Sequence, residues 1–451
     1  MGTIAIRRET KSPWERRTPV TPALARRLIS RGDVEVLVQP SPRRIFSDQE
    51  FAHAGARLSN DLSEAGLVLG VKEIPAELLL EGQAYMFFSH VIKGQPYNMA
   101  MLARLCELGC TLLDYEMVAD PDGRRLIFFG RFAGLAGMID SLWALGRRLG
   151  SEGVHTPLER IDTAHAYDSL ADALAEVRAA GREIAAEGLP ESLRPLVIGI
   201  AGYGNVASGV REILAELPIE EVAPADLSTL AAGDGRRIFV TTFKEEHMVV
   251  PTSEGAAFDL GEYYEFPERY RSVFSSYLPH LTALVNCTYW DARYPRVVTR
   301  DDVATLWADG ATPKMRLIAD ISCDPDGGVE CTLRPTDPGR PVYVYRPETG
   351  DAVDGVVGHG PVILAVEILP AELPREASEE FSSTLSRFLP ALAAADWSRP
   401  LDEIRLPDEV RRAVIVHRGE LTEEYRYLEE HLRGRAEPEI SPPDVPPPDV
   451  P

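Results

Sequence analysis

The sequence contains very little lysine. Its 47 basic residues comprise 42 arginines and only 5 lysines, against 70 acidic residues, and the formal net charge at pH 7 is −23. A surface that binds nucleic acid needs clustered basic side chains to neutralise phosphates, and the sequence has no basic stripe of that kind. We therefore expect no nucleic-acid partner.

Cysteine is also sparse, and long apolar runs are missing. The 5 cysteines are odd in number and scattered, which favours a reducing compartment, and we expect the cytoplasm. Cys106 and Cys110 fit core thiols better than metal ligands, because no CxxC pair or nearby histidine pair completes a site, and no metal is expected. The apolar stretch 127–146 is interrupted by Arg131 and Asp140, so it predicts a tightly packed helix and no membrane span. The N-terminus lacks the apolar segment of a secretory signal.

The chain does contain enough apolar material for two domains, since 45% of its 451 residues are hydrophobic and 26% are charged. Short apolar strands alternate with helical patterns, which predicts an α/β fold with mainly parallel sheets covered on both faces. Strands are expected at residues 3–6, 34–38, 67–71, 85–88 and 111–113, and helices at 21–31, 98–108, 130–146, 169–187 and 209–216. A loop-to-helix segment is expected over 358–369, and the repeated Pro-Pro-Asp-Val-Pro predicts an unfolded tail over 437–451.

A glycine-rich turn follows the apolar strand pattern at 195–201 and precedes a helical pattern. It consists of Gly202, Tyr203, Gly204, Asn205, Val206 and Ala207. In this context the glycines allow a tight turn and let the backbone approach a pyrophosphate at a helix N-terminus, although an ordinary strand–helix turn has the same pattern. Asp226 is the candidate for the acid that binds a ribose, but no clear strand precedes it, so the choice between NAD and NADP stays open.

Two titratable residues follow consecutive predicted strands. Lys72 lies at the end of the strand at 67–71, and His90 follows the strand at 85–88, with Lys93 three residues further on. The ends of parallel strands collect at one edge of a sheet, so Lys72 and His90 form a candidate acid–base pair. The alternative is that both are solvated charges at strand ends. The pairs Arg16-Arg17 and Arg124-Arg125 offer forked donors for carboxylates, or plain surface charge.

Several segments make the sequence similar to a known family. Residues 8–22 resemble the opening of the alanine dehydrogenase/transhydrogenase superfamily. The resemblance to lysine-forming saccharopine dehydrogenases rests on residues 70–73, 87–93, 114–116, 123–125, 129–137 and 373–378. The resemblance to the lysine–2-oxoglutarate reductase half of bifunctional aminoadipic semialdehyde synthases rests on 39–44, 155–157, 164–167, 202–206, 267–270, 289–290 and 320–322.

This resemblance covers residues 3–430 and implies two doubly wound, Rossmann-like domains with an interdomain cleft. Residues 1–137 and 336–436 would form the substrate domain, and residues 138–335 the dinucleotide-binding domain. The implied reaction condenses L-lysine with 2-oxoglutarate and reduces the imine to saccharopine. Alternatives are an amino-acid dehydrogenase such as alanine dehydrogenase, and a nucleotide-binding regulatory protein without catalysis. Whether a separate glutamate-forming saccharopine dehydrogenase acts on the product is left open.

The resemblance also implies roles for individual residues. Lys72 and His90 would be the acid–base groups, and Arg17 and Arg125 would bind the carboxylates of 2-oxoglutarate. Glu73, Lys93 and Glu116 would tune the charge around the acid–base pair, and Asp320 lies where the family has a cleft acid. The bifunctional relatives favour NADP(H) as cofactor, whereas an acid at Asp226 favours NAD(H).

Overall fold

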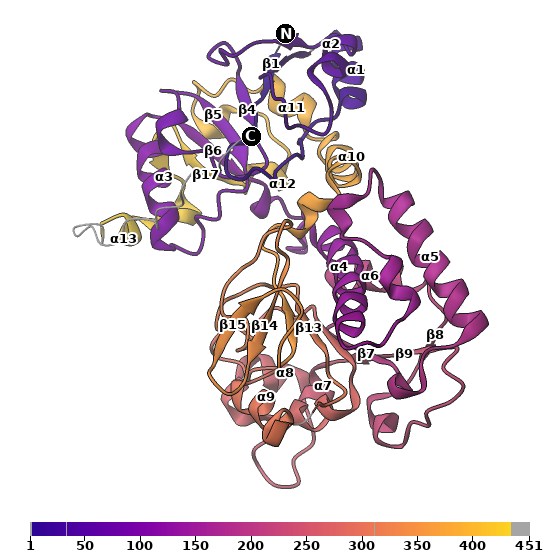
Figure 1. Ribbon diagram of the computed structural model, residues 1–451. Helices are drawn as coiled ribbons and strands as arrows, with labels where there is room; N and C mark the ends of the chain where they lie inside the picture. Colours follow the sequence, from indigo (N-terminus) through magenta and orange to yellow (C-terminus); the bar gives the residue numbers. More distant parts are fainter. Residues whose placement is uncertain (1, 33, 311, 434–451) are drawn as a thin grey trace. The chain divides into compact units, whose positions relative to one another are not determined.

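The computed structural model describes residues 2–32, 34–310 and 312–433, and the chain in it divides into two compact units (Figure 1). The first unit takes the chain up to Phe128 and from Ser378 onward, and the second takes Phe129–Ala377. The tail predicted over 437–451 lies outside the described residues.

The first unit is built on an eight-stranded sheet with the order β18-β17-β6-β5-β4-β1-β2-β3. Its strands are β1 (Gly2–Ile6), β2 (Val34–Val38), β3 (Arg57–Leu58), β4 (Leu67–Leu69), β5 (Ala84–Phe87), β6 (Thr111–Asp114), β17 (Val414–His417) and β18 (Glu420–Leu421). The strands from β3 to β6 are parallel, and β17 and β18 extend the sheet antiparallel. The helices are α1 (Pro22–Ser30), α2 (Asp48–His53), α3 (Pro96–Glu107), α10 (Pro374–Leu385), α11 (Leu389–Ala394), α12 (Asp408–Arg411) and α13 (Leu428–Arg433). The chain winds from β1 first to one side and then, through β4, to the other, as in doubly wound folds.

The second unit also has an eight-stranded sheet, with the order β15-β14-β16-β13-β12-β7-β9-β8. Its strands are β7 (Val197–Ala201), β8 (Ile219–Glu221), β9 (Ile238–Phe243), β12 (Ala283–Asn286), β13 (Leu317–Asp320), β14 (Val342–Arg346), β15 (Asp351–Asp354) and β16 (Val362–Leu364). A small ribbon pairs β10 (Val249–Pro251) with β11 (Tyr270–Ser272). The helices are α4 (Gly130–Ser151), α5 (Leu170–Glu187), α6 (Asn205–Leu214), α7 (Glu245–Met248), α8 (Leu260–Glu265) and α9 (Arg300–Leu306). The predicted α/β class with two doubly wound sheets is confirmed.

Two features of the second unit differ from the sequence expectations. The chain returns to the first unit after Ala377, not at residue 336, because β14, β15 and β16 extend the second sheet beyond β13. The predicted loop-to-helix segment over 358–369 is wrong, since it contains the fully buried strand β16, parallel to β13. A short apolar run between glycines cannot be distinguished from a buried helix by periodicity alone.

Glycines allow α4 and α6 to pack with their backbones in close contact. A Cβ on Gly134 would overlap the carbonyl oxygen of Val206, and a Cβ on Gly209 would overlap that of Arg131. The stretch 127–146, predicted as a tightly packed helix, therefore packs closely against α6 through these two glycines.

Replacing Gly134 by alanine is expected to destabilise the protein by about 2 kcal/mol, because the added methyl group has no space even though alanine favours the helix. Gly150 of the same helix is the matched control. A Cβ there meets the end of the Glu159 side chain at 3.2 Å, and that side chain can move, so Gly150→Ala should change stability little. Urea unfolding measures both variants. Equal stabilities would contradict the packing described for α4 and α6.

Two buried carboxyl groups face each other in the second unit. Asp140 of α4 is 0% exposed and Glu372 is 2% exposed. Asp140 accepts a hydrogen bond from the Ala164 N–H at 2.7 Å, and Glu372 accepts one from the His165 N–H at 3.2 Å. The other oxygen of each carboxyl group, Asp140 Oδ2 and Glu372 Oε1, is buried with no hydrogen-bond partner among the described residues, which disfavours the charged form of both groups. Burial raises the pKa of both groups, and raises that of Glu372 to about 7.

This pair should make stability depend on pH. Because the folded pKa of Glu372 exceeds its ordinary value of 4.5, the folded state holds a proton that the unfolded state releases. The stabilisation from this proton is therefore full below pH 4.5 and is lost, by about 3 kcal/mol in all, as the pH rises through about 7. Glu372→Gln should flatten this decline in urea unfolding between pH 5 and 8. The exposed control Glu367→Gln should keep it, and an unchanged slope in Glu372→Gln would refute the assignment.

Candidate functional site

Charged residues of the first unit gather where β1, β4, β5 and β6 end, at one edge of the sheet. The pairing of β4 with β5 continues past the strand ends, because the Phe88 N–H donates to the Val71 carbonyl oxygen at 3.1 Å. Lys72 and His90 therefore follow neighbouring parallel strands at the same edge, as the sequence predicts. Ligands bind outside the carboxyl ends of strands in folds of this type.

Lys72 occupies a turn that a carboxylate holds in place. The two oxygens of Glu9 accept hydrogen bonds from the backbone N–H groups of Val71 at 2.7 Å and of Lys72 at 3.1 Å. Burial lowers the pKa of the Lys72 ammonium, and the neighbouring Arg17 lowers it further, while Glu73 opposes both effects. The Lys72 amine consequently reaches its neutral form at a lower pH than an ordinary lysine.

Arg17 is locked against a carboxylate of its own segment. Its Nε donates to Glu15 Oε1 at 2.9 Å and its Nη2 donates to Glu15 Oε2 at 2.5 Å, and both side chains are almost fully buried. Burial alone would raise the pKa of Glu15, but the ion pair with Arg17 outweighs it and lowers the pKa. Two of the three guanidinium nitrogens of Arg17 are thus engaged by Glu15.

Glu73 is buried directly after Lys72. Its Oε1 accepts a hydrogen bond from Lys11 Nζ at 2.7 Å, whereas its Oε2 is buried with no hydrogen-bond partner among the described residues. The contact with Glu73 depends on the pairing of β1 with β4, which the sequence does not reveal.

His90 belongs to a chain of charged groups. Its Nδ1 lies 3.3 Å from Glu116 Oε2, and Arg125 Nη1 donates to Glu116 Oε1 at 3.2 Å. The hydrogen bond with His90 is the largest cause of the lowered pKa of Glu116, and Arg125 and Lys93 also contribute. His90, which follows β5, and Arg125, which follows β6, therefore both contact the Glu116 carboxylate.

The backbone around His90 is unusual. His90 has a φ of 52°, in the left-handed region that non-glycine residues seldom adopt. Its carbonyl accepts from Asn98 Nδ2 at 3.1 Å, and its ring stacks on Phe88 with centroids 6.1 Å apart. Buried Asp114 fixes the backbone of Ser89, which precedes His90, and of Glu116, its partner. It accepts from the Ser89 N–H at 3.0 Å and from the Glu116 N–H at 2.7 Å. Such strain is found at sites where surrounding contacts fix a functional side chain.

In the second unit, the glycine-rich turn borders a cavity of about 460 Å³. Gly202 has a φ of 99°, and a Cβ there would lie 3.1 Å from the Cys287 carbonyl oxygen. Gly204 is the N-cap of α6, whose first residues are Asn205, Val206 and Ala207. The N–H groups of a helix start suit a pyrophosphate, and the exposed rings of Tyr203 and Tyr289 suit a flat heterocycle. These residues fit a dinucleotide.

Two acids named from the sequence lie elsewhere in the second unit. Asp320, at the end of β13, is fully buried and accepts from Asn286 Nδ2 at 2.9 Å, Ser322 Oγ at 2.6 Å and Thr332 Oγ1 at 2.7 Å. Burial raises its pKa. Asp226 lies in the 3₁₀ turn Pro224–Thr229 after the edge strand β8, and it does not line the cavity.

Sequence reasoning missed Glu245, which does line the cavity. It follows β9, the strand that lies beside β7 in the sheet. The order of the strands in the sheet points to Glu245, whereas the distance along the sequence from the glycine-rich turn favours Asp226.

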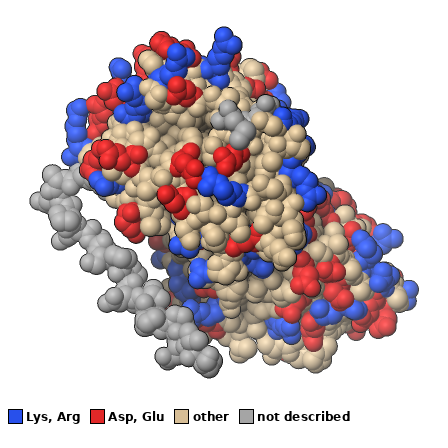
Figure 2. All heavy atoms as spheres, turned by 90° about the horizontal axis from the view of Figure 1, so that it is seen from above, with Lys and Arg blue, Asp and Glu red and all other residues tan. Residues whose placement is uncertain are grey.

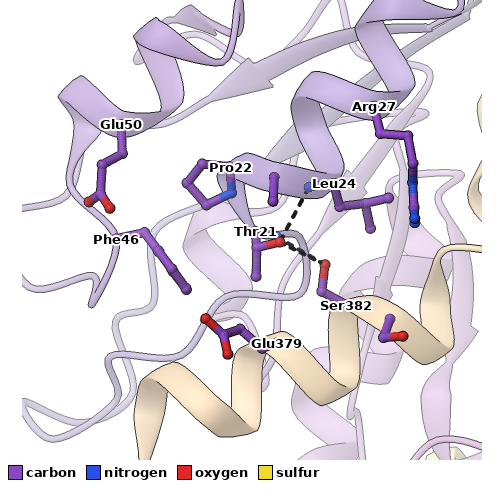
Figure 3. A pocket seen from close by; sticks show the side chains of 10 residues that line it. Thr21, Pro22, Leu24, Arg27, Phe46, Glu50, Glu379 and Ser382 are labelled. Atoms are coloured by element: carbon purple, nitrogen blue, oxygen red, sulfur yellow. Dashed lines mark hydrogen bonds between the residues drawn. The ribbon is translucent and has the colours of Figure 1, made fainter. Parts of the chain in front are cut away.

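A second cavity, of about 440 Å³, lies in the first unit between the start of α1, the start of α2 and α10 (Figure 3). Thr21 and Ser382 are hydrogen-bonded in it, with their hydroxyl oxygens 3.3 Å apart. None of the predicted catalytic residues lines this cavity. Acidic and basic side chains are interspersed on the molecular face in Figure 2. Among the described residues, no helix is long and apolar enough to span a membrane, and no three His, Cys, Asp or Glu side chains gather as a metal site.

Comparisons with known proteins agree with this architecture. Residues 5–136 match the family described as alanine dehydrogenase/PNT, N-terminal domain. The chain is 38% identical over 440 residues to the mitochondrial alpha-aminoadipic semialdehyde synthase of Bos taurus, covering 94% of this chain and 47% of the relative. It is 28% identical to the saccharopine dehydrogenase [NAD(+), L-lysine-forming] of Yarrowia lipolytica, covering 88% of this chain and 95% of the relative.

The fold itself is found in a solved structure of L-alanine dehydrogenase, with a TM-score of 0.61 at 17% identity, covering 95% of this chain and 99% of that one. The chain spans about half the length of the bovine synthase. The resemblance predicted from the sequence is confirmed: residues 5–136 match the alanine dehydrogenase/PNT N-terminal domain, and over most of its length the chain is similar to lysine-forming saccharopine dehydrogenase and to part of alpha-aminoadipic semialdehyde synthase.

Proposed function

We propose that the chain is an NAD(P)-dependent oxidoreductase that condenses L-lysine with 2-oxoglutarate and reduces the imine to saccharopine, or catalyses the reverse, lysine-forming reaction. The similarity to lysine-forming saccharopine dehydrogenase supports this substrate pair. The observation that carries the proposal is the lowered pKa of Lys72 at the same sheet edge as the His90–Glu116 pair. That edge therefore offers two side chains that can carry protons.

The chemistry needs these proton carriers at several stages. The ε-amine of substrate lysine must lose a proton before it attacks the C2 ketone of 2-oxoglutarate, and neutral Lys72 accepts that proton. The carbinolamine then loses its hydroxyl group as water, for which Lys72 or His90 returns a proton. A nicotinamide dinucleotide held by residues 202–207 would supply the hydride that reduces the imine carbon. His90, whose Nδ1 faces Glu116 at 3.3 Å, would donate a proton to the secondary amine that the reduction forms, and would regain it from solvent.

Arg17 and Arg125 are proposed to bind the carboxylates of 2-oxoglutarate. Arg125 is 38% exposed in its side chain and keeps one nitrogen on Glu116, so it can reach a ligand. The ion pair with Glu15 fixes the orientation of the Arg17 guanidinium and occupies two of its three nitrogens. Glu73, Lys93 and Glu116 are proposed to set the charge around the reacting amine. Asp320 of the second unit is proposed separately, as the acid that the family resemblance implies.

The cofactor is proposed to bind at residues 202–207 of the second unit, where α6 begins. The resemblance to bifunctional synthases favours NADP(H), whereas the relative from Yarrowia lipolytica is named for NAD(+). The five cysteines are all unpaired, which supports a reducing compartment such as the cytoplasm.

The oxidation of NADH or NADPH, followed at 340 nm, tests the substrate class. The proposal predicts turnover with L-lysine plus 2-oxoglutarate and none with pyruvate plus ammonium. The opposite pattern would indicate an alanine dehydrogenase. Turnover of neither mixture by a chain that binds a dinucleotide would exclude both enzymes. It would favour a nucleotide-binding protein without catalysis.

A further inference from the structure

The strand order of the second sheet decides which acid faces the adenosine half of a bound dinucleotide. The chain passes from β7 to the edge strand β8 and only then to β9, which inserts between them. In doubly wound nucleotide folds, an acid near the end of the strand beside the first one hydrogen-bonds the adenine ribose. Here that neighbouring strand is β9, and Glu245 lies two residues beyond its end at Phe243.

Glu245 is fixed by two tyrosines of the same cavity. Tyr203, between the two glycines of the turn, donates its hydroxyl to Glu245 Oε2 at 3.1 Å, and Tyr264 of α8 donates to Oε1 at 2.7 Å. Glu245, Tyr203 and Tyr264 all line the cavity together with Gly202 and Gly204. The carboxylate is therefore held beside the turn that would receive the pyrophosphate.

Two basic side chains, one on α6 and one at this cavity, are engaged in other contacts. Arg296 lines it, but its guanidinium binds the carbonyl oxygens of Asp326 and Gly327 and lies 4.8 Å from the Trp290 ring. Arg211 of α6 is paired with Glu221 at 2.6 Å.

Lys244 lies next to Glu245 in sequence. Its ammonium is 5.8 Å from the centre of the Tyr203 ring, and Lys244 is not part of the cavity lining. Among the described lining residues, Glu245 is the one carboxylate.

We infer that Glu245 accepts hydrogen bonds from the hydroxyl groups of the adenine ribose and thereby selects NAD(H) over NADP(H). The inference rests on the proposed function only in requiring that the cavity bind a nicotinamide dinucleotide. A ribose 2′-phosphate carries up to two negative charges and would meet the Glu245 carboxylate, whereas a 2′-hydroxyl donates to it. The same geometry assigns Asp226 no contact with the cofactor.

The test is direct binding of NADH and NADPH to the full chain, measured by nicotinamide fluorescence without substrates. The wild-type protein should bind NADH at least about 10-fold more tightly than NADPH. Glu245→Gln removes the charge and should bring the two dissociation constants to within about 3-fold. The controls Glu246→Gln, on the exposed neighbour, and Asp226→Asn should leave the wild-type ratio unchanged.

A second measurement needs no variant. Adenosine 5′-monophosphate should displace NADH from the wild-type protein at least about 10-fold more effectively than adenosine 2′,5′-bisphosphate. Equal binding of NADH and NADPH, or a ratio that moves with Asp226→Asn but not with Glu245→Gln, would overturn the inference and leave the dinucleotide site intact. Failure to bind either dinucleotide would overturn the proposed function as well.

Discussion

Replacing Lys72 by methionine or His90 by glutamine is expected to lower kcat by about 10- to 1000-fold, because each variant removes a proton carrier while keeping much of the side-chain volume. The lowered pKa of Lys72 also predicts the direction in which activity changes with pH. Activity that needs the neutral amine should rise with pH along a limb below 10.5, and Lys72→Met should lose that limb. Steady-state rates between pH 6 and 10, with L-lysine and 2-oxoglutarate, measure both effects.

The chain offers a matched control for each variant. Burial also lowers the pKa of Lys314, in the second unit, so Lys314→Met tests whether any half-buried lysine would give the same result. His53, at the end of α2, is exposed and serves as the control for His90. Both control variants should keep the wild-type kcat. Unchanged kinetics in Lys72→Met and His90→Gln would refute the assigned roles.

Arg17→Ala is expected to lower the free energy of unfolding by about 3–5 kcal/mol, because it leaves the buried Glu15 carboxylate without its partner. The two side chains are 2% and 0% exposed, so solvent screens their interaction little. Urea unfolding measures the loss. Arg16→Ala changes the exposed neighbour and should alter stability by less than about 0.5 kcal/mol.

The double variant Glu15→Gln with Arg17→Ala separates stability from substrate binding. Removing the buried charge should recover part of the stability lost in Arg17→Ala. The KM for 2-oxoglutarate should stay raised, because the guanidinium proposed to bind a substrate carboxylate is still missing. Recovery of the wild-type KM would show that Arg17 serves only as the partner of Glu15.

Much of the first unit could be predicted from the sequence because its strands are short apolar runs separated by clear helix starts and turns. The placement of Lys72 and His90 at one edge followed from parallel pairing, and the expected bounds of β2, at 34–38, agree with the structure. The contacts of Glu9 with the Lys72 turn and of Lys11 with Glu73 could not be predicted, since they join residues more than 60 positions apart.

The second unit was less predictable for a different reason. Sequence order suggested that the second strand of the nucleotide fold lies beside the first, and the acid was therefore sought after it, at Asp226. The structure places β9 beside β7 and β8 at the edge, which brings Glu245 to the cavity. Strand order depends on which apolar faces pack together across the whole unit, and no local pattern records it.

The most direct test of the proposed reaction is the transfer of deuterium from dideuterated [4-²H₂]NADH in the presence of L-lysine and 2-oxoglutarate. The product should have the mass of saccharopine plus one deuterium, located on the carbon that was C2 of 2-oxoglutarate, since the hydride reduces the imine there. Absence of labelled saccharopine, or label found instead in alanine when pyruvate and ammonium are supplied, would contradict the proposed function.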